Sequence, residues 1–146
     1  MPAPKSRLIQ EENPFKPVNT AIEIYKKMMG ICVKMPRRYT YLILKDMLDL
    51  AGEVMDYAKK ANSIFAQNDV EQQLRINYWH EARASLQALS TRINILLEVQ
   101  SSLTYRDGRQ TKGIKQSELE ALLDLIIEEM SMLKKTLEKE RGKLSA

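Results

Sequence analysis

The residues best suited to chemistry in this chain are two adjacent arginines, Arg37 and Arg38, which directly follow Pro36. A guanidinium group offers a planar fork of donors that matches phosphate and carboxylate oxygens, so the pair predicts contact with an anion. Both arginines stand at the expected start of a helix, where the macrodipole disfavours cations. An anionic partner explains this placement, and so does chance. Tyr39 and Tyr41 beside them can stack on unpaired bases or pack at the helix start.

Four further cations are predicted to belong to the same binding surface. Lys34 lies just before the proline, and Lys26 has no acidic partner of its own within its helix. Arg83 and Arg92 have no acidic residue three or four positions away, and they flank opposite sides of the apolar stripe of their helix. In an oligomer, one flank would line a subunit interface or a central channel, and the other would face outward.

Other charged residues are predicted to be ordinary surface groups. Three cations each have an acidic residue four positions earlier, which favours surface ion pairs. The adjacent acids Glu128 and Glu129 are expected on the solvated side of the last helix. The three predicted pairs are Glu23 with Lys27, Asp56 with Lys60, and Glu71 with Arg75.

No constellation of residues predicts catalysis. His80 and Cys32 are each the only residue of their type, whereas a zinc site usually needs several histidines or cysteines. Cys32 falls on an apolar stripe, where a buried and unreactive thiol is expected. The chain has no phosphate-binding glycine loop and no nucleophile elbow, and its histidine lacks the glutamate three positions earlier that di-metal bundles use. We therefore expect a protein that is not an enzyme and has no metal, cofactor or small-molecule substrate.

Four long segments position these residues. Apolar side chains recur at three- and four-residue spacing, which predicts four amphipathic helices. Pro36 lacks an amide hydrogen and should end the first helix near Lys34, after a start capped by Asn19. Ser117 is the expected cap of the last helix, which Gly142 ends. The expected core positions are Ile22, Tyr25, Met29 and Cys32 on the first helix; Leu44, Met47, Leu48, Ala51, Val54, Met55, Ala58 and Ala61 on the second; Tyr78, Trp79, Ala82, Leu86, Leu89, Ile93, Leu96 and Leu103 on the third; and Leu119, Leu122, Leu123, Ile126, Met130, Leu133 and Leu137 on the fourth.

Four helices with short connections predict an all-α fold, an antiparallel up-down-up-down four-helix bundle. In that topology the turn after the first helix and the loop after the third meet at one pole. The loop carries Arg106, Arg109, Lys112 and Lys115, so this pole should be basic, although polar loops are also basic for solubility alone. The predicted organisation is a flexible, proline-containing arm over 1–18, one bundle domain over 19–141 and a C-terminal tail over 142–146.

A second apolar stripe on the first helix predicts self-association. It lies about a quarter-turn or more from the core stripe, and a weaker version appears on the last helix. Such a surface favours a homo-oligomer, but broad stripes also pack against two neighbouring helices. The residues assigned to the subunit interface are Ile24, Met28, Ile31 and Met35 on the first helix and Leu125 and Met132 on the last.

Length and composition narrow the class of protein. The 146 residues suit one domain, and the net charge of +4 permits nucleic-acid binding without requiring it. No apolar run approaches the roughly 18 to 20 residues that a membrane crossing needs, and residues 1–7 lack the apolar segment of a signal peptide. One cysteine fits a reducing compartment. We expect a cytoplasmic protein with no membrane partner.

Three segments carry a family resemblance. These are MPRRYTYL over 35–42, the helix over 48–62 with the run AKKANSI over 58–64 at its end, and the segment 75–89. They resemble the accessory variability proteins of diversity-generating retroelements. They are also similar to the four-helix-bundle proteins encoded in intervening sequences of large-subunit ribosomal RNA genes. The resemblance covers about residues 20–137, and its most specific motif is the helix-breaking proline followed by basic residues.

The resemblance implies a basic homopentameric barrel that associates with a reverse transcriptase and supports mutagenic copying of a template RNA. It implies that Pro36 shapes the first turn and that Arg37 and Arg38 belong to the basic surface. The implied partners are the reverse transcriptase, template RNA or an RNA/cDNA hybrid, and further copies of this chain. Two alternatives stay open, namely a ribosomal-intervening-sequence type of bundle and a protein-interaction module that binds no nucleic acid.

Overall fold

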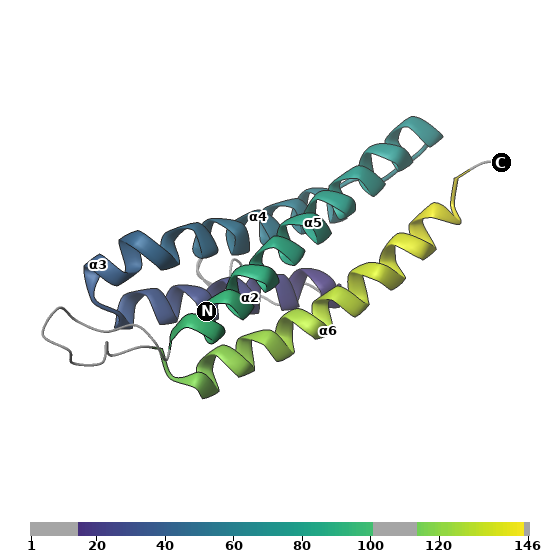
Figure 1. Ribbon diagram of the computed structural model, residues 1–146. Helices are drawn as coiled ribbons and strands as arrows, with labels where there is room; N and C mark the ends of the chain where they lie inside the picture. Colours follow the sequence, from purple (N-terminus) through teal and green to yellow (C-terminus); the bar gives the residue numbers. More distant parts are fainter. Residues whose placement is uncertain (1–14, 101–113, 145–146) are drawn as a thin grey trace, which may run out of the picture.

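The computed structural model describes residues 15–100 and 114–144, and every regular element within these ranges is helical. The long helices run along one another, as the all-α prediction required (Figure 1). The elements in chain order are α2 (Lys16–Lys34), the short α3 (Arg37–Tyr39), the π-helical η1 (Thr40–Leu44), α4 (Lys45–Asn62), α5 (Asp69–Gln100) and α6 (Gln116–Arg141).

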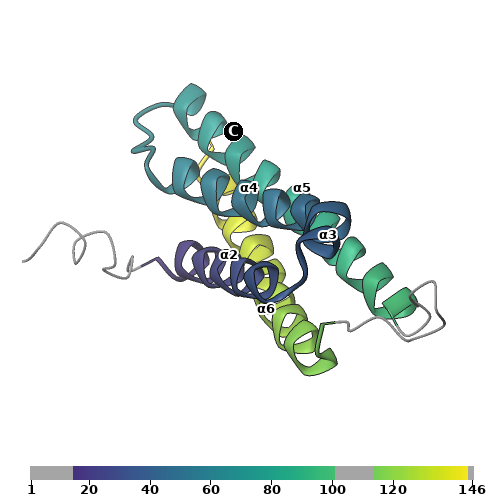
Figure 2. The ribbon, with the colours of Figure 1, turned by 90° about the vertical axis from the view of Figure 1, so that its left-hand side faces the viewer.

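The four long helices form a ring in the order α2, α4, α5, α6. Helix α2 packs against α4 and α6, α5 packs against the same two helices, and within the described ranges the diagonal pairs do not approach each other. Helix α6 runs antiparallel to α5, because Gln72 near the start of α5 meets Glu140 near the end of α6. Figure 2 shows this arrangement from the end that carries α3. The predicted up-down-up-down bundle is confirmed.

The break between α2 and α3 follows from proline chemistry. Met35 has the extended conformation (φ −92°, ψ 153°) that a residue before proline prefers. Pro36 has no amide hydrogen to continue the ladder of α2, which therefore ends at Lys34 as predicted. The Thr40 hydroxyl donates a hydrogen bond of 3.0 Å to the Cys32 carbonyl. The amide of Met35 also donates to this carbonyl, at 3.3 Å. The two donors take the place of the amide four residues after Cys32, which Pro36 lacks.

Two helix starts differ from the sequence prediction. Helix α2 begins at Lys16, before Asn19, and Pro17 occupies its first turn, where a missing amide hydrogen has no consequence. Pro17 and Val18 are buried, so they belong to the bundle, and the predicted boundary at 18/19 lies too late. The predicted arm otherwise falls outside the described residues. At α6 the cap residue is Lys115 instead of Ser117.

The core confirms the apolar pattern on three of the four helices. On α6, Leu123 and Met130 are half-buried, as are Leu48 and Met55 on α4 and Tyr78 on α5. Leu103 lies outside the described residues. The expected core positions that are buried are Leu44, Met47, Ala51, Val54, Ala58, Ala61, Trp79, Ala82, Leu86, Leu89, Ile93, Leu96, Leu119, Leu122, Ile126, Leu133 and Leu137.

Helix α2 faces the core with the stripe that was predicted to face another subunit. Ile24, Met28 and Ile31 are buried inside the single chain, so their assignment to a subunit interface is wrong. The early start of α2 explains the difference, because Val18 and Ala21 extend this stripe by two further turns and are also fully buried.

The residues predicted to form the core stripe of α2 lie mostly at the edge of its buried face. Met29 is exposed, and Ile22 and Tyr25 are half-buried, while Cys32 is buried as expected. The remaining interface candidates, Met35, Leu125 and Met132, are also half-buried. Their role in self-association stays a prediction.

One buried acid departs from the expectation of a solvated α6 surface. Glu129 is fully buried, and neither of its carboxylate oxygens has a hydrogen-bond partner. Burial raises the pKa of Glu129 to about 9, with a smaller effect from the charge of Glu128. Its neighbour Glu128 is exposed, as predicted, and pairs with Lys16 at 3.3 Å. Glu129 is therefore a neutral acid inside the core at physiological pH.

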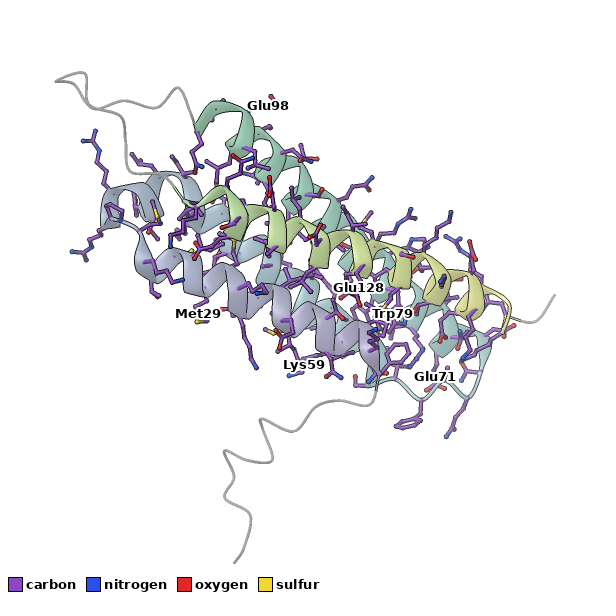
Figure 3. All side chains as sticks on the ribbon, turned by 90° about the horizontal axis from the view of Figure 1, so that it is seen from below. Met29, Lys59, Glu71, Trp79, Glu98 and Glu128 are labelled. Carbon is purple, nitrogen blue, oxygen red and sulfur yellow. The ribbon has the colours of Figure 1, made fainter. Side chains whose placement is uncertain are left out.

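Trp79 is the largest fully buried side chain near the middle of α5 (Figure 3). The ring of Phe15, just before α2, packs edge-on against it with a centroid distance of 5.6 Å. This contact joins the start of α2 to α5 across the bundle, between two helices whose backbones do not meet.

We predict that Glu129→Gln removes a pH-dependent destabilisation. Folding must keep a proton on Glu129 that the unfolded chain releases above about pH 4.5, so stability falls as the pH rises from there to about 9. At about 1.4 kcal/mol per pH unit, the variant should gain about 3 kcal/mol in free energy of unfolding at pH 7. Urea unfolding followed by circular dichroism at pH 5, 7 and 8.5 measures this gain.

The matched control is Glu128→Gln, which changes an exposed acid on the same helix. It should change the free energy of unfolding by under about 1 kcal/mol, because its pair with Lys16 is exposed, and it should keep the parent chain's loss of stability as the pH rises. Parallel stability curves for Glu129→Gln and the parent would show that Glu129 is not held neutral in the folded state.

Candidate anion-binding groove at the first turn

The two arginines of the proline motif are exposed on α3. Within the described ranges, neither Arg37 nor Arg38 forms an ion pair with a carboxylate. Their charges are therefore not neutralised by the surrounding described residues. An anion that reached this turn would meet two guanidinium groups free to change conformation.

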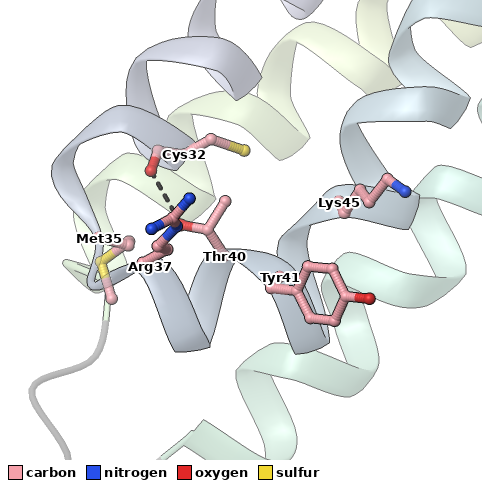
Figure 4. Close-up of a pocket in the computed structure, with 6 residues that line it drawn as sticks. All are labelled: Cys32, Met35, Arg37, Thr40, Tyr41 and Lys45. Atoms are coloured by element: carbon pink, nitrogen blue, oxygen red, sulfur yellow. Dashed lines mark hydrogen bonds between the residues drawn. The ribbon is translucent and has the colours of Figure 1, made fainter.

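A groove of about 350 Å³ lies beside these arginines, between the end of α2 and the start of α4. Figure 4 shows Met35 and Arg37 on one side of it and Tyr41 and Lys45 on the other. Among the described residues, the lining contains two cations and no acid, and the rest of it is largely apolar. The six lining residues are Cys32, Met35, Arg37, Thr40, Tyr41 and Lys45.

The local sequence builds this groove in two steps. Pro36 turns the chain out of α2, and the bond from Thr40 to Cys32 then holds the new helix against the old one. Arg37, Tyr41 and Lys45 follow at four-residue spacing, which places them along one side of the helical segment. Sequence reasoning missed Lys45 as a site residue, although this spacing was visible in the printed chain.

The thiol of Cys32 forms part of the groove wall. Burial raises the pKa of Cys32, so the side chain stays a protonated thiol at neutral pH. The expectation of a buried thiol is confirmed. Its contribution to the groove is apolar surface.

The other predicted cations do not join Arg37 at this groove. Lys34 lies nearby but pairs with Glu118 at 2.9 Å, and Arg92 pairs with Asp46 at 3.6 Å. Arg83 is half-buried on α5, and Lys26 is exposed on α2. None of the four lines the groove.

The predicted meeting of two chain connections at one pole is confirmed for the described residues. The side-chain amide of Gln100 donates to the Ile114 carbonyl at 2.8 Å and accepts from the Ile114 amide at 2.9 Å. With the pair of Lys34 and Glu118, these bonds bring the ends of α2 and α5 beside the start of α6 (Figure 1). Lys115 is exposed at this pole. The predicted contributions of Arg106, Arg109 and Lys112 lie outside the described residues.

The opposite end of the bundle is held by an arginine that was predicted to be a surface group. Arg75 does not pair with Glu71. Its Nε donates to the buried Glu140 carboxylate at 3.0 Å, and its Nη1 donates to the carbonyls of Ala61 and Ile64. Gln72 donates to the same carboxylate at 2.7 Å. Arg75 therefore ties the end of α4 to α5 and α6.

Hydrogen bonding keeps Glu140 charged. Burial alone would raise the pKa of Glu140, but the hydrogen bonds from Gln72 and Arg75, the charge of Arg75 and the contact with Lys143 lower it overall. This carboxylate is accordingly a structural anion, and Arg75 is not available to an external one.

The two other predicted surface pairs are also not formed. Lys27 makes no ion pair with Glu23 within the part of the chain that the structure describes. Lys60 lies over the ring of Tyr57, with 5.2 Å from Nζ to the ring centroid, instead of pairing with Asp56. Cation–π attraction of this kind suits an exposed lysine beside a half-buried ring.

His80 accepts a hydrogen bond of 2.9 Å from Arg141 Nη2 to its Nε2. Burial lowers the pKa of His80, and the positive charges of Arg141 and Arg83 lower it further, so the ring is neutral at physiological pH. Over residues 15–100 and 114–144, no three histidine, cysteine, aspartate or glutamate side chains gather closely enough to hold a metal ion.

Comparisons with known proteins identify no relative of this chain. A scan against models of protein families and searches of curated proteins and of solved structures find no match to this chain. The class established by the structure is an all-α four-helix bundle, and the family resemblance depends on the sequence segments named above. Among the helices that the structure describes, none combines the length and the apolar character needed to cross a bilayer.

We predict that Arg75→Leu destabilises the bundle by about 3 kcal/mol, because it leaves the buried Glu140 carboxylate without its main cationic partner. In the parent chain, the stability that Glu140 contributes is present above its ordinary pKa and is lost as the pH falls through its lowered folded pKa. In the variant, the free energy of unfolding should no longer fall in this way at acid pH. Urea unfolding between pH 3 and pH 7 tests both effects.

Lys143→Leu is the control, because Lys143 contacts the same carboxylate from an exposed position, at 3.2 Å. It should change stability by under about 1 kcal/mol. Equal losses in the two variants would mean that Arg75 is not the central partner of Glu140.

Proposed function

We propose that this protein is a non-enzymatic accessory subunit that docks a reverse transcriptase together with its template RNA, or an RNA/cDNA hybrid, and so supports mutagenic cDNA synthesis. The observation that carries the proposal is that Arg37 and Arg38 are exposed and form no ion pair with any residue that the structure describes, beside a groove whose described lining contains no acid. The motif that bears the family resemblance and the free cationic surface are thus the same residues.

The physical basis of this docking is attraction between guanidinium groups and phosphates. Each phosphate that a cation neutralises releases condensed counterions, so binding weakens as salt rises. Three contacts, from Arg37, Arg38 and Lys45, would give a log–log salt slope of about −2 on a single strand, at about −0.7 per contact. The same arginines also suit an acidic surface on the polymerase, and the two partners would then share one pole of the bundle.

The proposal includes self-assembly, for which the family resemblance implies five subunits. The buried stripe of α2 gives it no support. Apolar side chains that remain exposed do support it, namely Met29 and Val33 on α2 and Ile127 on α6. Val33 and Met29 are one turn apart, so they lie on one side of α2.

We predict that the double variant Arg37→Glu/Arg38→Glu lowers affinity for single-stranded RNA at least tenfold and prevents capture of the polymerase, while helicity is unchanged. Charge reversal replaces two phosphate attractions with repulsions at exposed positions that contribute no core packing. Fluorescence anisotropy between 50 and 300 mM salt measures the affinity and its slope. A pull-down with the co-expressed reverse transcriptase measures capture.

Lys134→Glu/Lys135→Glu is the matched control, because it reverses two adjacent, exposed cations on α6. It changes net charge by the same amount and should bind RNA nearly as the parent does. An equal loss of RNA affinity in both double variants would show that the effect comes from net charge alone. An affinity that stays flat across the salt range would remove the electrostatic mechanism.

We predict that light scattering gives a mass several times the 16.9 kDa of one chain at micromolar concentration. Val33→Asp should lower that mass, because Val33 is 77% exposed and a charge there opposes burial against a second subunit. Phe65→Asp is the control, since Phe65 is 87% exposed between α4 and α5, at the opposite end of the bundle from Val33. A strict monomer in the parent chain would end the proposal of self-assembly.

A further inference from the structure

We propose that the groove at the first turn binds one unpaired nucleotide of RNA, with its base stacked on the ring of Tyr41 and its phosphate between Arg37 and Lys45. This inference depends on the proposed RNA binding and names the form of RNA and the site that receives it. It adds the ring of Tyr41 to the three cations Arg37, Arg38 and Lys45 of the proposed function.

Tyr41 presents an exposed aromatic ring at the groove. Tyr41 is 72% exposed and forms no ring pair within the described residues, although it lines an apolar groove. An aromatic side chain of this size usually buries its ring against other apolar surface. Every nucleobase has a flat π-face that can stack on such a ring, whatever the RNA sequence. Stacking of this kind is a main source of affinity for single strands.

Charge complementarity favours an anionic occupant over an apolar one. Arg37 and Lys45 line the groove without an acidic partner, and the next acid along α4, Asp46, pairs with Arg92. Asp49 stands four positions after Lys45 but makes no ion pair with it. Two uncompensated cations on either side of an apolar surface match a nucleotide, which joins an apolar base to a charged phosphate.

The size of the groove sets the form of the nucleic acid. Its volume of about 350 Å³ lies at the small end of the range of ligand pockets, which begins at about 300 Å³. One base with its sugar can enter, whereas the bases of an A-form duplex are paired and stacked and cannot reach a protein ring. The groove should therefore prefer single-stranded RNA to a duplex of equal length.

The test uses the full chain with a fluorescein-labelled twelve-nucleotide oligouridine and a twelve-base-pair RNA duplex, measured by fluorescence anisotropy. The parent should bind the single strand more tightly. Tyr41→Ala should weaken single-strand binding about tenfold and leave duplex binding unchanged, whereas Tyr41→Phe should retain the parent affinity because it keeps the ring. Leu42→Ala is the control, since Leu42 is an exposed apolar neighbour that does not line the groove.

The outcomes separate this inference from the proposed function. If Arg37→Glu/Arg38→Glu loses RNA while Tyr41→Ala binds like the parent, the nucleotide site is wrong and RNA docking stands. If polyglutamate binds as tightly as oligouridine and neither responds to Tyr41→Ala, the groove serves an acidic protein instead. If the parent binds no RNA at all, both proposals fall. Far-UV circular dichroism confirms that each variant is folded.

Discussion

The missing amide hydrogen of Pro36 is the constraint on which the rest of this structure depends. It ends α2 at Lys34 and leaves the last carbonyls of that helix to other donors, one of which is the Thr40 hydroxyl. The chain then reverses, so that α4 returns along α2 and the remaining helices complete the ring. The same break leaves two arginines exposed at the reversal and opens the groove between the old helix and the new one.

Two glutamates on α6 show how environment decides the state of one side-chain type. Glu129 and Glu140 are both buried, but only Glu140 meets an arginine, a glutamine and a lysine. Its charge is kept, and it ties three helices together. Glu129 has no hydrogen-bond partner and carries a proton instead. One end of the bundle thus contains a buried carboxylate whose charge is balanced and hydrogen-bonded, whereas the middle contains a buried acid without hydrogen bonds.

Sequence periodicity predicted the fold class, the number of long helices and the apolar faces of α4, α5 and α6, because these faces are single and continuous. It failed on α2, where two stripes of similar apolarity compete. The choice between them depended on where the helix starts, and a proline in the first turn concealed the start. Arg75 was misassigned because local spacing cannot reveal Glu140, which is 65 residues away in the chain.

Only part of the candidate site was predicted, because the sequence shows the motif but not the packing around it. The arginines were visible as a motif, but the groove beside them comes from the packing of α2 against the reversed chain. Lys45 shares the four-residue spacing of Arg37 and Tyr41, but its position at a groove depends on how the reversed chain packs against α2. Burial and cavities depend on three-dimensional packing, and no spacing rule contains them.

The π-helical turn η1 carries an extra residue compared with an ordinary helical turn. If the segment between Pro36 and α4 were one residue shorter, regular α-helical geometry would be restored. The wide turn takes up the extra residue, so α3 keeps nearly the direction relative to α4 that an uninterrupted helix would give it. An α-helix that took up the same residue without widening would turn everything before it by about 100° around the helix axis. The π-helical turn therefore lets the chain hold one more residue at the reversal while Arg37 stays on its side of the helix.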